Sequence, residues 1–88
     1  MKTHIRQSFL DDVNSVRERG LRQRAKEAMR RVEQAESLRD VPNLRKLHGL
    51  KNHYRIRVGT YRIGISLHED TVFFVRFLPR RDIYRYFP

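Results

Sequence analysis

Hydrophobic residues in the first part of the chain recur at helical spacing. The first set lies three or four positions apart and consists of Phe9, Val13 and Val16. This spacing predicts a helix from Phe9 to Arg19. Ser8, with Asp11 three residues later, matches the capping pattern at a helix start, and Gly20 is typical of the position after a helix end. We therefore expect Ser8 and Gly20 to bound this helix.

A second hydrophobic stripe follows with the same spacing. Its members are Leu21, Ala25, Ala28, Met29, Val32 and Ala35, and charged residues fill most positions between them. Pro42 disfavours helical geometry in the residue before it, so we expect the second helix to end near Leu38. The two stripes predict a helical hairpin, joined at Gly20, that packs its hydrophobic side on a sheet.

In the second half of the chain the hydrophobic period changes to two, which is typical of strands. One alternating set is Tyr54, Ile56 and Val58, and the next is Tyr61, Ile63, Ile65 and Leu67. The Gly59-Thr60 pair between them predicts a tight hairpin with a type II′ turn. In that hairpin Arg57 faces Arg62. Arg55, Arg57 and Arg62 then share one face of the sheet, and the hydrophobic residues share the other.

The segment from Thr71 to Leu78 is hydrophobic on both faces except at Arg76, as expected of a central strand. The residues expected on its core face are Phe73, Val75 and Phe77. Arg76 then lies beside Arg62 on the basic face, which requires a connection of odd length or a bulge.

These elements predict an α+β fold in one domain spanning residues 1–88. A short strand around Ile5, within Thr3 to Gln7, precedes the helices and three strands follow them, in the order β-α-α-β-β-β. We expect a small antiparallel sheet with the helical hairpin packed on one face. The other face carries arginines.

The charge of the chain indicates a binding surface in addition to the fold. Its 88 residues include 20 Lys and Arg against 10 Asp and Glu, which gives a formal net charge of +10. Sixteen of these cations are arginines, whose planar guanidinium pairs with phosphate through two parallel hydrogen bonds. No acidic residue lies between Val41 and His68. This stretch is therefore a candidate phosphate-binding surface.

Composition and motif spacing exclude several classes of protein. The chain has no cysteine, which excludes disulfides, thiolate metal sites and cysteine nucleophiles. Its four glycines are isolated, so no phosphate-binding loop or dinucleotide fingerprint is present. No hydrophobic run approaches the roughly 18 residues of a membrane span, and the N-terminus lacks a signal-peptide stretch. We expect a cytoplasmic protein that uses no metal, no small-molecule cofactor and no membrane.

The pair of arginines across the hairpin indicates an anionic ligand. Like charges directly opposite each other destabilise a hairpin by up to about 1 kcal/mol, so stability alone does not favour Arg57 opposite Arg62. Cleavage of RNA is one reaction that such a surface supports, because the 2′-hydroxyl is an internal nucleophile beside the phosphorus. The protein orients that hydroxyl, accepts its proton, stabilises the phosphorane charge and protonates the leaving 5′-oxygen.

The run from Leu44 to Pro88, LRKLHGLKNHYRIRVGTYRIGISLHEDTVFFVRFLPRRDIYRYFP, resembles the RelE/ParE superfamily of type II toxins. Members commonly show a KL-x-G-x-x-x-YRIRVG-x-YRI core and end in an HR-x-x-IYR-like segment. The two-helix segment before the run has the size and order expected of the family. The superfamily includes ribosome-dependent mRNA endonucleases of the RelE kind and gyrase poisons of the ParE kind on one fold.

The resemblance to RelE implies roles for individual residues. Arg55 and Arg57 match its basic strand positions, and Arg62 matches the strand arginine after the turn. Arg81 and Tyr84 match its C-terminal pair. In the family these positions hold the mRNA backbone, stabilise the transition state and handle protons. The further basic residues expected to contact RNA are Arg45, Lys46, His48, Lys51, His53, Arg76, Arg80 and Arg85.

The chain departs from the RelE pattern at positions that matter for proton transfer. RelE itself has lysines where Arg55 and Arg57 stand, and an arginine does not give up its proton. Close relatives have a histidine where this chain has Pro79. The candidate proton acceptors are then Tyr84, which comes first, and His48, His53, Lys46 and Lys51. The alternative for Tyr84 is an aromatic residue that packs the tail on the sheet edge.

The sequence therefore predicts the toxin of a type II toxin–antitoxin pair that cuts mRNA in the A site of the 30S subunit. Its expected protein partner is an acidic antitoxin, because a chain at +10 with an open cationic face attracts one. Two alternatives stay open: a gyrase inhibitor whose arginines form a docking surface, and a non-enzymatic nucleic-acid-binding module. Clustering of the cations on the open face of the sheet favours the nuclease.

Overall fold

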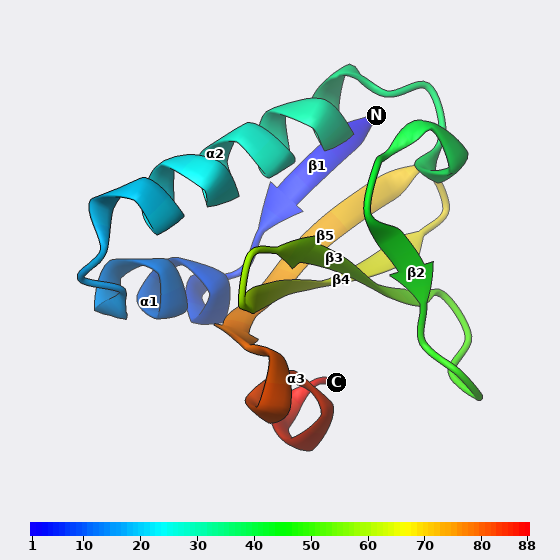
Figure 1. Ribbon diagram of the computed structural model, residues 1–88. Coiled ribbons are helices and arrows are strands. Elements are labelled where there is room, and N and C mark those ends of the chain that lie inside the picture. The colour runs from blue at the N-terminus through cyan, green and yellow to red at the C-terminus, as the bar shows by residue number, and fades with distance from the viewer.

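A computed structural model of the chain, which describes residues 1–88, consists of a five-stranded sheet with helices on both sides (Figure 1). The strands are β1 (Lys2–Ile5), β2 (Leu44–Lys46), β3 (His53–Val58), β4 (Tyr61–His68) and β5 (Thr71–Pro79). The helices are α1 (Gln7–Ser15), α2 (Arg19–Gln34) and α3 (Arg80–Tyr86), with a 3₁₀ turn at Leu38–Asp40. The predicted α+β fold is confirmed.

The strand order is β1-β5-β4-β3-β2. The pairs β2·β3, β3·β4 and β4·β5 are antiparallel, as predicted, whereas β1 runs parallel to β5. The sheet is therefore mixed rather than wholly antiparallel. The two N-terminal helices carry the chain from β1 at one edge of the sheet to β2 at the other edge.

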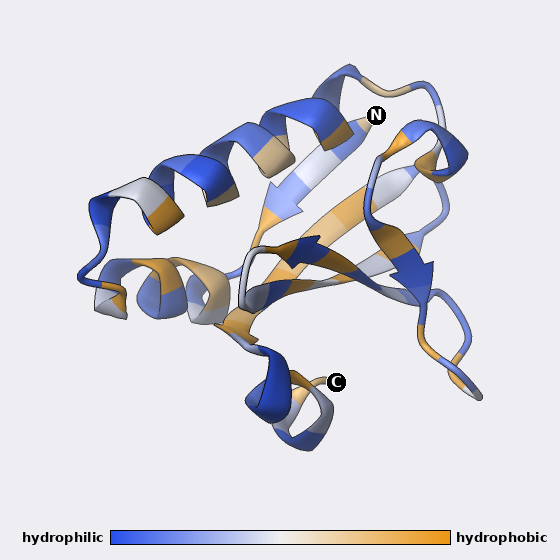
Figure 2. Cartoon of the chain, in the orientation of Figure 1, coloured by the Kyte–Doolittle hydropathy of each residue, from blue (hydrophilic) through white to orange (hydrophobic).

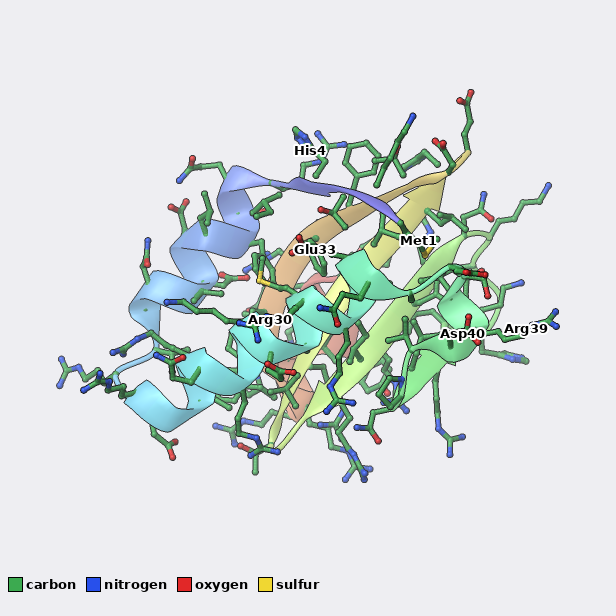
Figure 3. The ribbon with its side chains drawn as sticks, turned by 90° about the horizontal axis from the view of Figure 1, so that it is seen from above. Met1, His4, Arg30, Glu33, Arg39 and Asp40 are labelled. Carbon is green, nitrogen blue, oxygen red and sulfur yellow. The ribbon has the colours of Figure 1, made fainter.

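The main hydrophobic core lies between the sheet and the two N-terminal helices. Side chains with no more than 1% exposure in this core are Phe9, Ala25, Val32, Ile63, Ile65, Val72, Phe74 and Phe77. Seen from above, α2 lies over the sheet (Figure 3). Its charged residues face away from the sheet, while its apolar stripe faces toward it (Figure 2). The two hydrophobic stripes seen in the sequence therefore face the core.

The predicted boundaries of the first helix are wrong at both ends. Ser8 lies inside α1 and caps nothing: its hydroxyl donates a hydrogen bond of 2.6 Å to the carbonyl oxygen of Val75. Gly20 lies in the first turn of α2 rather than between the helices. The connection is instead closed by the guanidinium of Arg22, which donates to the carbonyl oxygens of Val16 and Arg17.

The predicted end of the second helix is also wrong, by about one turn. α2 ends at Gln34, and the ammonium group of Met1 donates hydrogen bonds of 2.8 Å to the carbonyl oxygens of Glu33 and Ala35 (Figure 3). The N-terminus of the chain thus satisfies the last carbonyls of α2. Leu38 is buried, but it lies in the 3₁₀ turn that follows.

The hairpin of β3 and β4 has the predicted register. Val58 pairs with Tyr61 and Arg57 pairs with Arg62 across the Gly59-Thr60 turn. Gly59 has a φ of 60°, which a residue with a side chain adopts only at a cost. Ile56, Ile63 and Ile65 are buried on the helix side, as predicted, with exposures of 2%, 0% and 0%.

The predicted faces of β5 are wrong for its first half. A bulge between Gly64 and Ile65 of β4 leaves Val75 without a partner, since Gly64 pairs with Arg76 and Ile65 pairs with Phe74. The bulge reverses the alternation. The core residues of β5 are therefore Val72, Phe74 and Phe77, whereas Phe73 and Val75 lie outside the main core.

Two elements do not follow from the sequence pattern. β2 has three residues and pairs with β3, and α3 forms in the tail after Pro79. α3 lies on the side of the sheet opposite α2 (Figure 1), where Ile83 and Phe87 form a small second cluster with Leu47. None of the three helices has the length and hydropathy needed to cross a membrane.

Candidate functional site

The hairpin of β3 and β4 places three arginines on the face of the sheet opposite α2. Arg55 pairs with Gly64 and Arg57 pairs with Arg62, so the three side chains leave the same face at neighbouring positions. All three line a common hollow. The sequence prediction for the placement of these arginines is confirmed.

Arg62 is the most buried arginine of this group, with 7% of its surface exposed. Its Nη1 atom donates to the carbonyl oxygens of Gly59 and Tyr61, at 3.0 and 2.9 Å. Its Nε atom is buried and has no hydrogen-bond partner. A buried, charged donor without an acceptor is costly, and an anion bound beside Arg62 would offset part of this cost.

The surroundings of Arg62 oppose its charge. Burial lowers the pKa of its guanidinium, and the positive charges of Arg55, Arg80 and Arg57 lower it further. Tyr84 acts in the opposite direction and raises the pKa of Arg62, because a phenolate there favours the cation. The site is thus rich in positive charge at short range and lacks a compensating carboxylate.

The helix α3 completes the site from the C-terminal side. It begins directly after β5 and brings Arg80, Arg81 and Tyr84 to the same side of the sheet as Arg62. Arg80, Arg81 and Tyr84 line a hollow of about 640 Å³ together with Arg57 and Arg62. The guanidinium carbon of Arg55 lies 5.7 Å from the centre of the Tyr84 ring.

A second hollow of about 690 Å³ adjoins the first and is lined by Asn43, Leu44, Arg45, Arg55, Arg57, Arg62 and Arg80. Arg57, Arg62 and Arg80 line both hollows, so the two form one continuous surface. We call the arginines that line it the arginine cluster: Arg45, Arg55, Arg57, Arg62, Arg80 and Arg81. A volume of this size takes a group as large as a nucleotide.

No carboxylate neutralises the arginine cluster. The chain has four ion pairs, Lys2–Asp70, Arg30–Glu27, Arg31–Glu27 and Arg76–Asp12, and none of them includes a member of the cluster. No group of three or more His, Cys, Asp or Glu side chains is placed to hold a metal ion. The surface is therefore built to receive an anion that this chain does not itself supply.

Arg76 lies on the predicted face of the sheet, and the predicted bulge is present, since Arg76 pairs with Gly64 and Gly64 pairs with Arg55. Arg76 nevertheless lines neither hollow of the arginine cluster. Its side chain reaches α1, where its Nε atom donates to a carboxylate oxygen of Asp12 at 2.7 Å. The same carboxylate accepts the backbone N–H of Phe77. The hydrogen bond with Asp12 raises the pKa of Arg76. Arg76 thus ties α1 to β5 and has its charge satisfied within the fold.

The loop before β3 does not reach the arginine cluster. Lys46, His48 and Lys51 line a separate hollow formed by the end of β2 and the loop after it. The Nδ1 atom of His53 lies 2.6 Å from the carbonyl oxygen of Lys51, and its ring packs near Phe87. Arg85 is exposed on α3 and lines neither hollow of the cluster. Tyr84 is therefore the predicted proton acceptor that the structure brings to the cluster.

The structure gives Arg80, one of the predicted basic residues, a central place in the site, and it adds Asn43 and Thr60, which the sequence did not single out. Arg80 stands at the junction of the two hollows and acts on the charge of Arg62. Asn43 lies 14 positions before Arg57 and accepts a hydrogen bond from its Nη2 atom at 3.5 Å. Thr60 lines the first hollow. The acid-free stretch that begins at Val41 contains Asn43 and Thr60, but nothing in the sequence distinguishes them from ordinary turn residues.

Known proteins resemble this chain over its whole length. A family model described as the ParE toxin of the type II toxin-antitoxin system parDE matches residues 4–84. The chain is 40% identical over 89 residues to Toxin RelE3 of Methanocaldococcus jannaschii, and the alignment covers 100% of each protein.

Solved structures share the fold. A RelB-RelE antitoxin-toxin complex from Methanococcus jannaschii has a chain that superposes with a TM-score of 0.80 at 38% identity, covering 96% of this chain and 98% of that one. YafQ from E. coli superposes with a TM-score of 0.74 at 16% identity, covering 94% and 97%, and shows the fold alone. The match of residues 4–84 to the ParE model and the matches of nearly the whole chain to RelE relatives lead to one conclusion: this chain belongs to the RelE/ParE family of type II toxins.

Proposed function

We propose that this toxin is an endoribonuclease that cuts mRNA in the A site of the ribosome without a metal ion. The observation that carries the proposal is the arginine cluster, in which Arg62 presents a buried Nε–H with no acceptor and no carboxylate lies in reach. A phosphodiester passing to a phosphorane gains negative charge, and donors fixed in advance stabilise that charge most effectively.

Each step of the proposed reaction is assigned to a group on this surface. The 2′-hydroxyl oxygen attacks the adjacent phosphorus, the bond from phosphorus to the 5′-oxygen breaks, and a 2′,3′-cyclic phosphate is left. Arg55 and Arg57 hold the phosphate, and Arg62 stabilises the phosphorane. Arg81 donates a hydrogen bond to the leaving 5′-oxygen, which takes its proton from water, and Tyr84 takes the proton of the 2′-hydroxyl.

Tyr84 fits the role of proton acceptor by position. Its side chain is 57% exposed and lines the hollow with Arg62, so a substrate can reach its hydroxyl. The cation of Arg55 lies over its ring, which fixes the ring near the phosphate-binding arginines. The exposure argues against the alternative in which Tyr84 packs the tail on the sheet.

We also propose that an acidic antitoxin is the protein partner of this chain. Its 38% identical relative was solved in a RelB-RelE antitoxin-toxin complex. The residues that line a further hollow between α2 and β3 include the cationic Arg24, Arg31 and Arg57 and the apolar Val41 and Ile56. Since Arg57 also belongs to the cluster, an acidic segment that folds along this side can reach the site. Displacement of the tail by the antitoxin is the other route to the same site.

A second candidate function is inhibition of DNA gyrase, and the match to the ParE family model favours it. In that case the arginines form a docking surface and perform no chemistry. The two functions differ in what happens to RNA, which makes them separable by experiment.

The test is cleavage of a reporter mRNA by the purified chain, with and without ribosomes. We expect cleavage with ribosomes, unchanged by a chelator. Replacing the ribose at the cut site by deoxyribose removes the nucleophile, so we expect cleavage to stop while binding stays nearly unchanged. We expect Tyr84→Phe to lower the rate and to change its pH dependence. Intact mRNA together with loss of gyrase supercoiling activity contradicts the nuclease and supports the ParE-like function.

A further inference from the structure

The helix that carries Arg80, Arg81 and Tyr84 is held on the sheet by a hydrophobic cluster separate from the main core. This second cluster consists of the buried residues Leu47, Ile83 and Phe87, with Val75 and Leu78 packed against it. Ile83 is 0% exposed and Phe87 is 5% exposed. Both lie on the face of the sheet that carries the arginines, so the cluster supports the site from beside it.

Phe87 occupies a space that exists because residue 64 is a glycine. A Cβ atom placed on Gly64 would lie 2.7 Å from two atoms of the Phe87 ring and 2.9 Å from a third. Carbon atoms do not approach so closely without displacement. Gly64 sits in the middle of β4, where glycine weakens a strand, so its presence marks a close approach of another group. That group is the Phe87 ring.

Residues of α3 and its C-cap residue Phe87 have two different roles: one pair holds the helix on the sheet, and another pair lines the hollow. Ile83 and Phe87 are four positions apart and face the sheet, while Arg80 and Tyr84 are four positions apart and line the hollow. A helix of seven residues does not hold its shape in water without tertiary contacts. The N–H of Phe87 also donates to the carbonyl oxygen of Ile83 at 2.9 Å, so the last helical turn extends to Phe87 itself.

We propose that Phe87, seated over Gly64, is a positioning residue that sets the place of Arg81 and Tyr84 relative to the strand arginines. The catalytic part of this inference rests on the proposed nuclease function. Phe87 touches no substrate. It acts through α3, so its loss leaves the phosphate-binding strand arginines in place and moves the groups assigned to proton transfer.

The test uses the contact itself. Gly64→Ala adds one methyl group that displaces the Phe87 ring and alters no charge, and Phe87→Ala empties the space. Phe87→Leu refills part of it and serves as the conservative variant. The double variant carries Gly64→Ala together with Phe87→Ala, so the added methyl group has no ring to displace. We therefore expect its cleavage rate to be no lower than that of Phe87→Ala alone.

We expect Gly64→Ala and Phe87→Ala to lower the single-turnover cleavage rate on the order of 100-fold, since small displacements of reacting groups have effects of that size. The Kd for RNA with deoxyribose at the cut site is expected to change less than about threefold, because the strand arginines still hold the phosphate. Phe87→Leu recovers part of the rate. Wild-type rates in both alanine variants overturn the proposal, as do equal losses in rate and affinity.

A second measurement keeps this test apart from the proposed function. In NMR spectra we expect faster amide exchange in α3 of Gly64→Ala, unchanged exchange in β4, and loss of the contact between Arg55 and the Tyr84 ring. If the wild-type chain cuts no RNA, the nuclease proposal fails and this measurement alone decides the positioning role. Retention of the Arg55–Tyr84 contact in Gly64→Ala, or faster exchange throughout the sheet, overturns it.

Discussion

Arg62 stays charged in surroundings that oppose the charge. Burial and the charges of Arg55 and Arg80 lower its pKa, yet an arginine keeps its proton because its ordinary pKa lies far above neutrality. A pKa lower in the folded than in the unfolded chain means that the cation prefers the unfolded chain. The charge of Arg62 therefore reduces the free energy of unfolding at every pH below the pKa of Arg62 in the folded chain. This destabilisation decreases only when the pH rises above that pKa.

The first prediction follows from this sign. Arg62→Met keeps most of the side-chain volume and removes the charge and the unpaired Nε–H. It also removes the two hydrogen bonds from Nη1 to the turn carbonyls of Gly59 and Tyr61, which offsets part of the gain. We expect the free energy of unfolding, measured in urea at pH 7, to stay unchanged or to rise by about 1 kcal/mol, since a like-charged pair across the hairpin is relieved. Cleavage is expected to fall about 100-fold, because a donor to the phosphorane is lost.

Arg76 provides the matched control, since it is a strand arginine with a carboxylate partner. Arg76→Met leaves the Asp12 carboxylate without its cation, so we expect a loss of about 2 kcal/mol in the free energy of unfolding. Its cleavage rate is expected to match that of the wild-type chain. If both methionine variants lose stability alike, the account of Arg62 as an uncompensated charge is contradicted.

At the residue scale, the sequence predicts which side chains face each other across a hairpin, because strand alternation and a two-residue turn determine the register. The facing of Arg57 and Arg62 follows from the Gly59-Thr60 hairpin and is confirmed. The partner of Arg76 does not follow, because Asp12 is 64 positions away and no pattern links the two. The catalytic roles assigned to Arg55, Arg57, Arg62, Arg81 and Tyr84 stay predictions.

At the scale of elements, periodicity gives the helices and long strands but not the irregularities that tertiary contacts produce. Placing Arg76 on the basic face already requires a connection of odd length or a bulge, and the structure has the bulge. Its position at Val75 does not follow from the sequence, because the residues around it are hydrophobic on both faces. The helix α3 is too short to predict from propensity, since it depends on Ile83 and Phe87 packing on the sheet. The site gains Arg80 through this helix.

The second prediction concerns the contact between α1 and the bulge. The Ser8 hydroxyl donates to the carbonyl oxygen of Val75 at 2.6 Å, in a partly buried position. We expect Ser8→Ala to lower the free energy of unfolding by about 1 kcal/mol, the usual contribution of such a hydrogen bond. Ser15→Ala is the control, because the Ser15 hydroxyl donates to the Asp11 carbonyl at an exposed position and is expected to cost little.

A further variant separates this contact from a helix cap. Asparagine is as good an N-cap residue as serine, so Ser8→Asn restores stability if Ser8 caps α1. We expect no recovery, since Ser8 lies within the helix and its partner is on β5. Urea denaturation of the three variants decides between the two roles.

At the scale of the molecule, the ion pairs lie outside the arginine cluster, which leaves one face of the sheet strongly cationic. The carboxylates of Glu27, Asp70 and Asp12 pair with residues on α2, β1 and β5. An uncompensated surface of this kind attracts polyanions at long range, and the attraction falls as salt screens it. The net charge of +10 predicts such attraction, but only the fold shows which face carries it.

The third prediction is that the salt dependence of RNA binding comes from this face. Each phosphate contact on a single strand contributes a slope of about −0.7 to the logarithm of affinity against the logarithm of salt concentration. We expect Arg57→Ala to reduce the slope by about that amount, measured with a short RNA that carries deoxyribose at the cut site. Arg30→Ala serves as the control, because Arg30 is exposed on α2 and pairs with Glu27. Equal slopes for the two variants would mean that RNA binds the chain by its overall charge rather than at the arginine cluster.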